Sequence, residues 1–180
     1  MKPGAGKTKG AAFERLVCKR LSLWVSGGRQ KDIFYRSSMS GGRATVLSKK
    51  GESWGSVAGD ICSVHPLGHK LTDKIFFECK HLKDAYLLQL LIKQSGPLLS
   101  YWDTVCDQAS KYNKLPCLIV KQNFQRDLLF FPVGRVSLGF PALLEAHPPR
   151  SDPYLVFHFD DFLELDFIQM TFERNGFYFA

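Results

Sequence analysis

The 180-residue sequence contains no apolar run that approaches the roughly 18 residues needed to span a bilayer. Its Lys-rich start also lacks the apolar segment of a secretion signal. The five cysteines are an odd number, include no Cys-x-x-Cys pair and lie mostly in apolar runs. We therefore expect a cytoplasmic protein of a reducing compartment, with no membrane segment, no disulfide and no zinc site.

Acidic residues are scarce in the first third of the chain. Within residues 1–50, twelve Lys or Arg residues stand against only Glu14 and Asp32, a net charge of +10 in a chain whose total is +7. Residues 151–180 carry a net charge of −5. This uneven distribution favours a polyanionic partner such as nucleic acid. A generally solvated basic surface is the alternative explanation.

Apolar periodicity divides the chain into alternating helices and strands. Phe13, Val17, Leu21 and Trp24 recur at helical spacing and predict an amphipathic helix over residues 9–25. We also expect a second helix over residues 97–112, strands at residues 32–36, 57–64, 74–80, 115–121, 128–133 and 154–159, and a Pro-rich linker at residues 141–153. This order predicts one domain built as an α/β sandwich with a mixed central sheet.

Asp60, Glu78 and Lys80 are the residues that most clearly indicate chemistry. Gly59-Asp60 begins one apolar run, and Glu78-Cys79-Lys80 ends the next. Because side chains alternate across a strand, Glu78 and Lys80 project from one face while Cys79 points away. A carboxylate and an ammonium are thus expected side by side.

The stretch between these two motifs, residues 65–69, is rich in turn residues. We therefore expect residues 57–64 to fold back as an antiparallel neighbour of residues 74–80 and to bring Asp60 beside Glu78. Two carboxylates and a lysine in one small region could hold a hard divalent ion such as Mg²⁺ against a substrate phosphate. The alternative is a surface hairpin with an ordinary exposed ion pair, which would leave Asp60 as an unpaired acid within an apolar run.

Four short motifs follow one another along the first two thirds of the chain. They are Lys9-Gly10 leading into Phe13-Glu14-Arg15, Arg36-Ser37-Ser38 with Ser40-Gly41-Gly42, Gly59-Asp60, and Glu78-Cys79-Lys80. In this order, over about residues 9–121, they resemble the PD-(D/E)xK nuclease superfamily, most closely archaeal-type Holliday-junction resolvases and their phage relatives. The resemblance implies a restriction-endonuclease-like sandwich, a mixed central β-sheet flanked by helices. It places the nuclease core at about residues 9–135 and leaves residues 136–180 as an extension of unknown role.

The resemblance also implies an activity and a role for each site residue. The enzyme would be a Mg²⁺-dependent endonuclease that hydrolyses phosphodiester bonds in branched DNA, with Mn²⁺ as a substitute ion. Asp60, Glu78 and the backbone carbonyl of Cys79 would bind the metal. Lys80 would orient the attacking water or offset charge on the phosphate, and Glu14 would act on a second metal or through water.

The same resemblance implies how DNA is held. Arg36, Ser37 and Ser38 would bind a backbone phosphate, and such resolvases act as homodimers that cut two strands symmetrically. The other residues expected to contact DNA are Lys9 and, in the Ser-, Gly- and Lys-rich stretch 37–56, Arg43, Lys49 and Lys50. The protein would then be nucleoid-associated, or encoded by a phage and active in the host cytoplasm.

Two other functions remain open. Gln108 and Tyr112 lie four residues apart on the second expected helix and resemble the third motif of RecB-type and lambda-exonuclease-type nucleases. That motif favours a nuclease, of this kind or of the restriction type, that acts on linear DNA. Tyr112 also falls on the apolar stripe of its helix, where core packing explains it better than a catalytic role. The remaining alternative is an accessory protein that binds DNA with this fold but has no catalytic activity.

Overall fold

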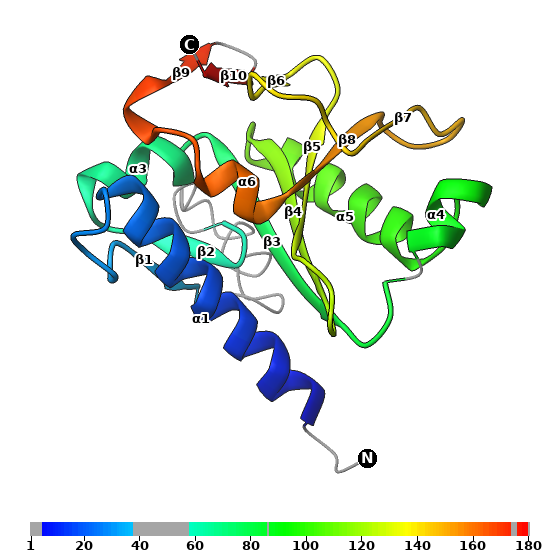
Figure 1. The fold of residues 1–180 in the computed structure, drawn as a ribbon, viewed down its shortest axis with the longest axis horizontal. Helices are drawn as coiled ribbons and strands as arrows, with labels where there is room; N and C mark the ends of the chain where they lie inside the picture. Colours follow the sequence, from blue (N-terminus) through cyan, green and yellow to red (C-terminus); the bar gives the residue numbers. More distant parts are fainter. Residues whose placement is uncertain (1–4, 38–57, 86, 174–175, 180) are drawn as a thin grey trace.

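The central element is a mixed five-stranded sheet (Figure 1). The computed structural model describes residues 5–37, 58–85, 87–173 and 176–179. The strands follow the order β3 (Ile75–Leu82), β4 (Leu115–Gln122), β5 (Leu128–Pro132), β8 (Tyr154–His158) and β7 (Leu144–Ala146). β3 and β4 are parallel, and the other neighbouring pairs are antiparallel. The predicted α/β sandwich with a mixed central sheet is confirmed.

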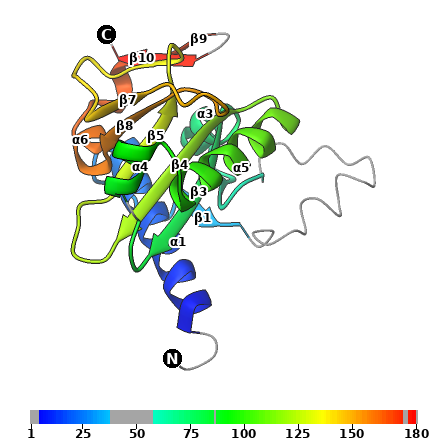
Figure 2. The same ribbon diagram turned by 90° about the vertical axis from the view of Figure 1, so that its right-hand side faces the viewer.

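Helices cover both faces of this sheet. One face carries α1 (Ala5–Val25), with α3 (Pro66–Thr72) and α6 (Phe159–Leu163) beside it, and the other carries α4 (Leu87–Lys93) and α5 (Pro97–Lys111) (Figures 1 and 2). Alternating strand residues therefore build two separate apolar cores, one under α1 and one under α5. Within the described residues, no helix has the length and apolar character needed to cross a membrane.

Residues 61–72 differ from the predicted hairpin. β2 (Ile61–Ser63) pairs antiparallel with β1 (Phe34–Arg36), not with β3, and the expected turn at residues 65–69 is the start of helix α3. His65 is the N-cap, since its Nδ1 accepts a hydrogen bond from the amide of Leu67, and Pro66 occupies the first helical turn. Gly68 permits close packing, because a Cβ there would lie 2.1 Å from Ser63 Oγ.

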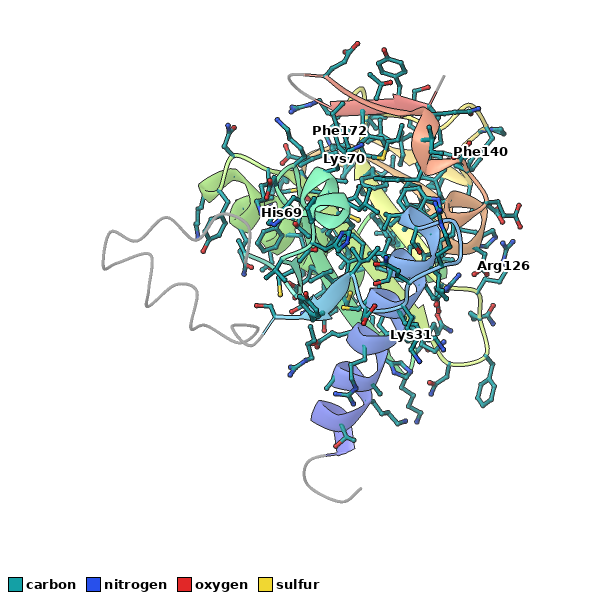
Figure 3. The ribbon with its side chains drawn as sticks, turned by 90° about the vertical axis from the view of Figure 1, so that its left-hand side faces the viewer. Lys31, His69, Lys70, Arg126, Phe140 and Phe172 are labelled. Carbon is teal, nitrogen blue, oxygen red and sulfur yellow. The ribbon has the colours of Figure 1, made fainter. Side chains whose placement is uncertain are left out.

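The C-terminal part of the chain contributes more structure than the sequence predicted. The Pro-rich stretch 141–153 contains β7, which forms the far edge of the central sheet. A second sheet joins β6 (Val136–Ser137), β10 (Gly176–Phe179) and β9 (Met170–Glu173), and a short 3₁₀ helix, η2 (Phe167–Gln169), precedes β9. Figure 3 shows Phe140 and Phe172 in this region, and Phe172 packs on Phe177 with ring centroids 5.7 Å apart.

Candidate active site

Asp60 is held at the outer edge of β3 by one hydrogen bond of its backbone and one of its side chain. Its amide donates to Phe77 O at 2.8 Å, and its Oδ2 accepts from the amide of Cys79 at 2.9 Å. Gly59 makes this approach possible, because it has a φ of +96° and a Cβ there would lie 2.7 Å from Phe77 O. The Gly-Asp pair therefore places a carboxylate, only 7% exposed, on the strand that carries the second motif.

Glu78 and Lys80 lie on the α5 face of β3, while Cys79 is buried in the core under α1. The Lys80 ammonium donates to Glu78 Oε1. It also lies 5.4 Å from the ring centroid of Tyr101 on α5, which is cation–π geometry. The lysine is thus held by a carboxylate of its own strand and by an aromatic ring of the covering helix.

Asp60 and Glu78 act on each other electrostatically. Burial, then the charge of Glu78, raises the pKa of Asp60 to about 7, and the hydrogen bond from Cys79 only partly opposes this. Burial lowers the pKa of Lys80, but the charge of Glu78 and the hydrogen bond to it outweigh that effect, so the net shift is upward. The site therefore combines a protonated lysine with a buried carboxyl, that of Asp60, whose ionisation is disfavoured by burial and by the charge of Glu78.

The donor set matches what Mg²⁺ commonly takes from proteins. In an extended strand the N–H and C=O of one residue point to the same side, so the carbonyl of Cys79 faces the edge where its amide meets Asp60. Two carboxylates with a carbonyl leave room for water and phosphate oxygens around such an ion. Among the described residues, no group of three or more His, Cys, Asp or Glu side chains lies close enough to form a cage by itself.

Glu14 approaches from the opposite side of Asp60, on α1. It is 8% exposed and forms an ion pair with Arg36 Nε, and its charge adds to the upward shift of the Asp60 pKa. Ser37 is buried, and its amide donates to Asp60 O at 2.8 Å. The structure thus brings Arg36 and Ser37 to the site as neighbours of the acids, and their binding of phosphate stays a prediction.

Of the remaining predicted DNA-binding residues, the structure describes Lys9 alone. Lys9 is exposed on the first half of α1, which projects beyond the sheet (Figures 1 and 2). Four others lie outside the described residues: Ser38, Arg43, Lys49 and Lys50.

A comparison with protein families identifies the chain. A family model described as phage putative PDDEXK endonuclease matches residues 5–148, a span that holds all of the acids and the lysine discussed above. The chain belongs to this family. The predicted superfamily is therefore confirmed, and membership places the protein among nucleases, for which DNA is the implied substrate. No match to the chain was found among curated proteins or among solved structures.

The name PDDEXK describes an acid followed by a D/E-x-K tripeptide. In this PDDEXK endonuclease, Gly59-Asp60 precedes Glu78-Cys79-Lys80, and the structure puts the two motifs on one edge of β3. The proline of the family's name is replaced by Gly59, whose positive φ and close approach to Phe77 explain the substitution.

The two residues that resemble a RecB-type motif, Gln108 on α5 and Tyr112 at its C-cap, have different surroundings. Gln108 is exposed, whereas the Tyr112 ring stacks on Phe76 with centroids 6.1 Å apart. Tyr101, which the sequence did not suggest, is the α5 residue in contact with Lys80. Helical periodicity places Tyr101 at the margin of the apolar stripe of α5, but no sequence signal indicates that this turn covers Lys80.

Proposed function

We propose that the protein is a Mg²⁺-dependent DNA endonuclease that cuts branched DNA such as a four-way junction. The observation that carries this proposal is the Asp60 carboxylate fixed on the Cys79 amide beside the Glu78–Lys80 pair. A buried acid such as Asp60, whose pKa is raised by burial and by a neighbouring carboxylate, is typical of sites built to bind a cation.

Each residue of the site has its own role in this proposal. Asp60, Glu78 and the Cys79 carbonyl would hold Mg²⁺, which when bound supplies Lewis-acid activation of water and phosphate. Lys80, oriented by Glu78 and Tyr101, presents its ammonium to the charge that develops on the phosphate. Glu14, with Arg36 as its partner, lies near enough to Asp60 to act on a second ion or through water.

Charge and symmetry extend the proposal to the substrate. The net charge of +10 in residues 1–50 supplies attraction for a DNA backbone around the site. A four-way junction presents two equivalent strands, so we propose a homodimer with one site for each strand. We also propose that residues 1–180 form a single domain, because β7 and β8 complete the sheet that carries the site.

The test compares three DNA substrates with the same purified protein. A four-way junction, a linear duplex and a single strand are each incubated with Mg²⁺, Mn²⁺, Ca²⁺ or EDTA, and the products are mapped to the nucleotide. Paired nicks in the junction, supported by Mg²⁺ and Mn²⁺ and not by Ca²⁺ or EDTA, are the expected result.

The other two functions give different products. Progressive loss from duplex ends would replace the proposal with a RecB-like enzyme, and defined cuts within the linear duplex would indicate a restriction-type enzyme. Tight binding without metal-dependent cutting would indicate an accessory DNA-binding protein. Sedimentation of the protein with and without the junction tests the homodimer separately.

A further inference from the structure

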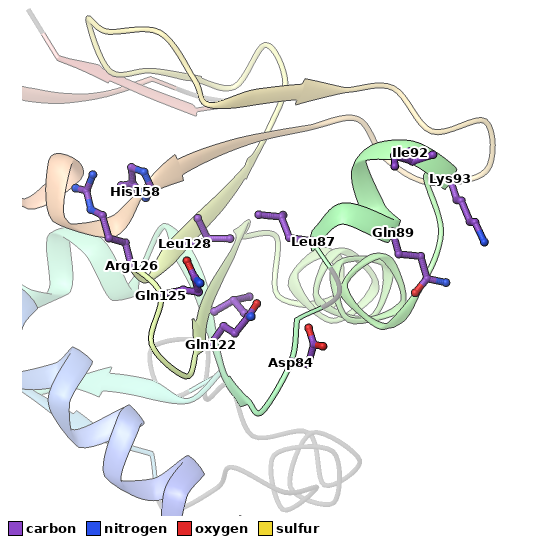
Figure 4. A pocket seen from close by; sticks show the side chains of 11 residues that line it. Asp84, Leu87, Gln89, Ile92, Lys93, Gln122, Gln125, Arg126, Leu128 and His158 are labelled. Carbon is purple, nitrogen blue, oxygen red and sulfur yellow. The ribbon is translucent and has the colours of Figure 1, made fainter.

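A pocket of about 890 Å³ opens between α4 and the central sheet (Figure 4). This is within the usual size of small-molecule sites in proteins, roughly 300–1,000 Å³. Its floor is apolar and includes Leu87, Val120 and Leu128. The pocket is therefore large enough, and apolar enough in this part of its lining, for an aromatic ring with substituents.

The pocket lies on the same sheet face as Glu78 and Lys80. Val120 of the pocket floor is the register partner of Lys80, and Gln122 is the partner of Leu82, in the parallel β3–β4 ladder. Neighbouring strands lie about 4.8 Å apart, so the pocket begins one strand away from the catalytic lysine. Phosphates of one DNA strand follow each other at roughly 3.4 Å along the axis, so a nucleotide next to a phosphate at Lys80 reaches this pocket.

Three of the seven polar side chains that line the pocket are neutral amides. Gln89, Gln122 and Gln125 line it, and the Gln122 side chain is oriented by accepting a hydrogen bond from the amide of Ala85 at 3.1 Å. An amide both donates and accepts hydrogen bonds, which matches the mixed edge of a nucleobase. Figure 4 shows Gln122 and Gln125 on the side of the central sheet and Gln89 on the side of α4.

The charges of the pocket do not favour a phosphate. Arg126 is paired with Asp160 and Asp161, and Asp84 offsets Lys93 among the lining residues. His158 also lines the pocket.

We propose that this pocket binds one unpaired nucleobase of the DNA substrate, adjacent to the phosphate at Glu78 and Lys80. The inference rests on the proposed nuclease function and specifies its substrate. A paired base must leave its stack to enter such a pocket, whereas a base at a junction, bulge or flap is already free. The pocket therefore favours DNA with unpaired nucleotides over an intact duplex.

The experiment measures base-dependent affinity without cutting. Two duplexes are compared, one with a single bulged adenine nucleotide and one with an abasic bulge at the same place, and their Kd values are obtained by fluorescence anisotropy in EDTA. For the wild type we expect about tenfold tighter binding of the adenine bulge, in the range measured for base contacts. Leu87→Trp fills the pocket, and Gln125→Leu removes an amide from its exposed wall.

In both variants, the ratio of the Kd for the abasic bulge to the Kd for the adenine bulge should fall close to one. Gln169→Leu, the same exchange at an exposed position in η2, should keep the wild-type ratio. A wild-type ratio of one, or a tenfold ratio retained in both variants, would overturn the proposal. Circular dichroism checks folding, and Gln125→Leu decides alone if Leu87→Trp does not fold, because Gln125 is exposed.

Cleavage is measured separately with Mg²⁺ on a four-way junction, so the two proposals fail in different ways. Base-dependent affinity without cutting contradicts the nuclease function and keeps the pocket. Cutting with a ratio of one keeps the nuclease function and removes the pocket from substrate recognition.

Discussion

Asp60 and Asp127 are equally buried, at 7% and 6% exposed, but their neighbours carry opposite charges. The two carboxylate oxygens of Asp127 lie 3.3 Å from Arg20 Nη1 and from Lys121 Nζ, respectively. Arg20 also forms an ion pair with Asp160 of α6. Asp60 is instead surrounded by Glu78 and Glu14, with Lys80 as the lesser influence. The first cluster fastens α1 to the C-terminal part of the chain, whereas the second brings like charges together, which a proton or a bound cation relieves.

The pKa values of the two clusters move in opposite directions. Burial would raise the pKa of Asp160, but its contacts with Arg20 and Arg126 bring it below its usual range. The pKa of Asp60 is raised to about 7. A cluster of balanced charge thus stabilises the fold, and a cluster of unbalanced charge is the better place to look for function.

The largest expected effect comes from removing the charge of Asp60. Asp60→Asn keeps the shape of the side chain but removes a metal ligand, so cleavage should fall by ~1000-fold or more. DNA affinity in EDTA should stay within about threefold of the wild type, because basic residues supply most of the attraction to phosphate. Quantitative cleavage of a junction with Mg²⁺ measures the loss, and turnover near the wild-type rate would remove Asp60 from the mechanism.

Gly59→Ala tests how tightly Asp60 must be placed. A Cβ at this position would lie 2.7 Å from Phe77 O, and the φ of +96° is unfavourable for alanine. The Asp60 carboxylate should shift, and a displacement of about 1 Å can lower a rate by ~100-fold. Cleavage rates under saturating Mg²⁺ give the effect. Gly134→Ala, at another positive φ but with no atom within 4 Å of the added Cβ, is the matched control for backbone strain and should cut normally.

Metal-free stability should fall as the pH rises through the Asp60 titration. Between the ordinary value of 3.8 and about 7, the folded state holds a proton that the unfolded chain has released, so the free energy of unfolding decreases with pH over this window. At about 1.4 kcal/mol per pKa unit, the decrease over the whole window is about 4 kcal/mol, of which roughly 3 kcal/mol falls between pH 4.5 and pH 7.5. Urea unfolding in EDTA at pH 4.5 and pH 7.5 measures it.

The Asp60→Asn variant isolates this contribution. Because asparagine does not titrate, the variant should lose less stability than the wild type between the two pH values. An identical pH dependence in both proteins would mean that Asp60 ionises freely and that Glu78 does not restrain it.

Asp127→Asn should lower stability and leave cleavage almost unchanged, whereas Asp60→Asn should mainly abolish cleavage. The Asp127 exchange leaves Arg20 and Lys121 without their shared carboxylate, which should lower the free energy of unfolding by about 2 kcal/mol. Cleavage per folded molecule should stay near the wild-type value at 25 °C. A large loss of cleavage with unchanged urea unfolding would contradict the separation of the two clusters.

The sequence predicted the chemistry of the site better than the path of the chain through it. Glu78 and Lys80 share a face because strand alternation is a local property, and helix α1 follows from its own apolar period. The hairpin expected between Asp60 and Glu78 was wrong, although the structure does bring the two acids together. The packing of Gly68 on Ser63 and the cap at His65 favour helix α3, and these depend on contacts that a local pattern does not contain.

Two further parts could not be predicted for the same reason. β10 pairs with β6, about forty residues earlier in the chain; its aromatic residues suit a strand, but four residues do not indicate which strand they pair with. The pocket under α4 depends on how α4 lies over β4, which the apolar run of residues 84–92 does not specify. Long-range packing, not composition, decides both features.

The smallest expected effect concerns Tyr101, whose aromatic ring lies beside Lys80 in the cluster around Asp60. Lys80 lies 5.4 Å from the ring centroid, a contact worth about 0.5–1 kcal/mol at a partly exposed site. Tyr101→Leu should therefore lower kcat by about three- to fivefold with little change in KM, while Tyr101→Phe, which keeps the ring, should stay near the wild type. Tyr178→Leu, on β10, is the control for replacing a partly exposed tyrosine. Equal losses in the Leu and Phe variants would show that the hydroxyl, and not the face of the ring, supports the catalytic lysine.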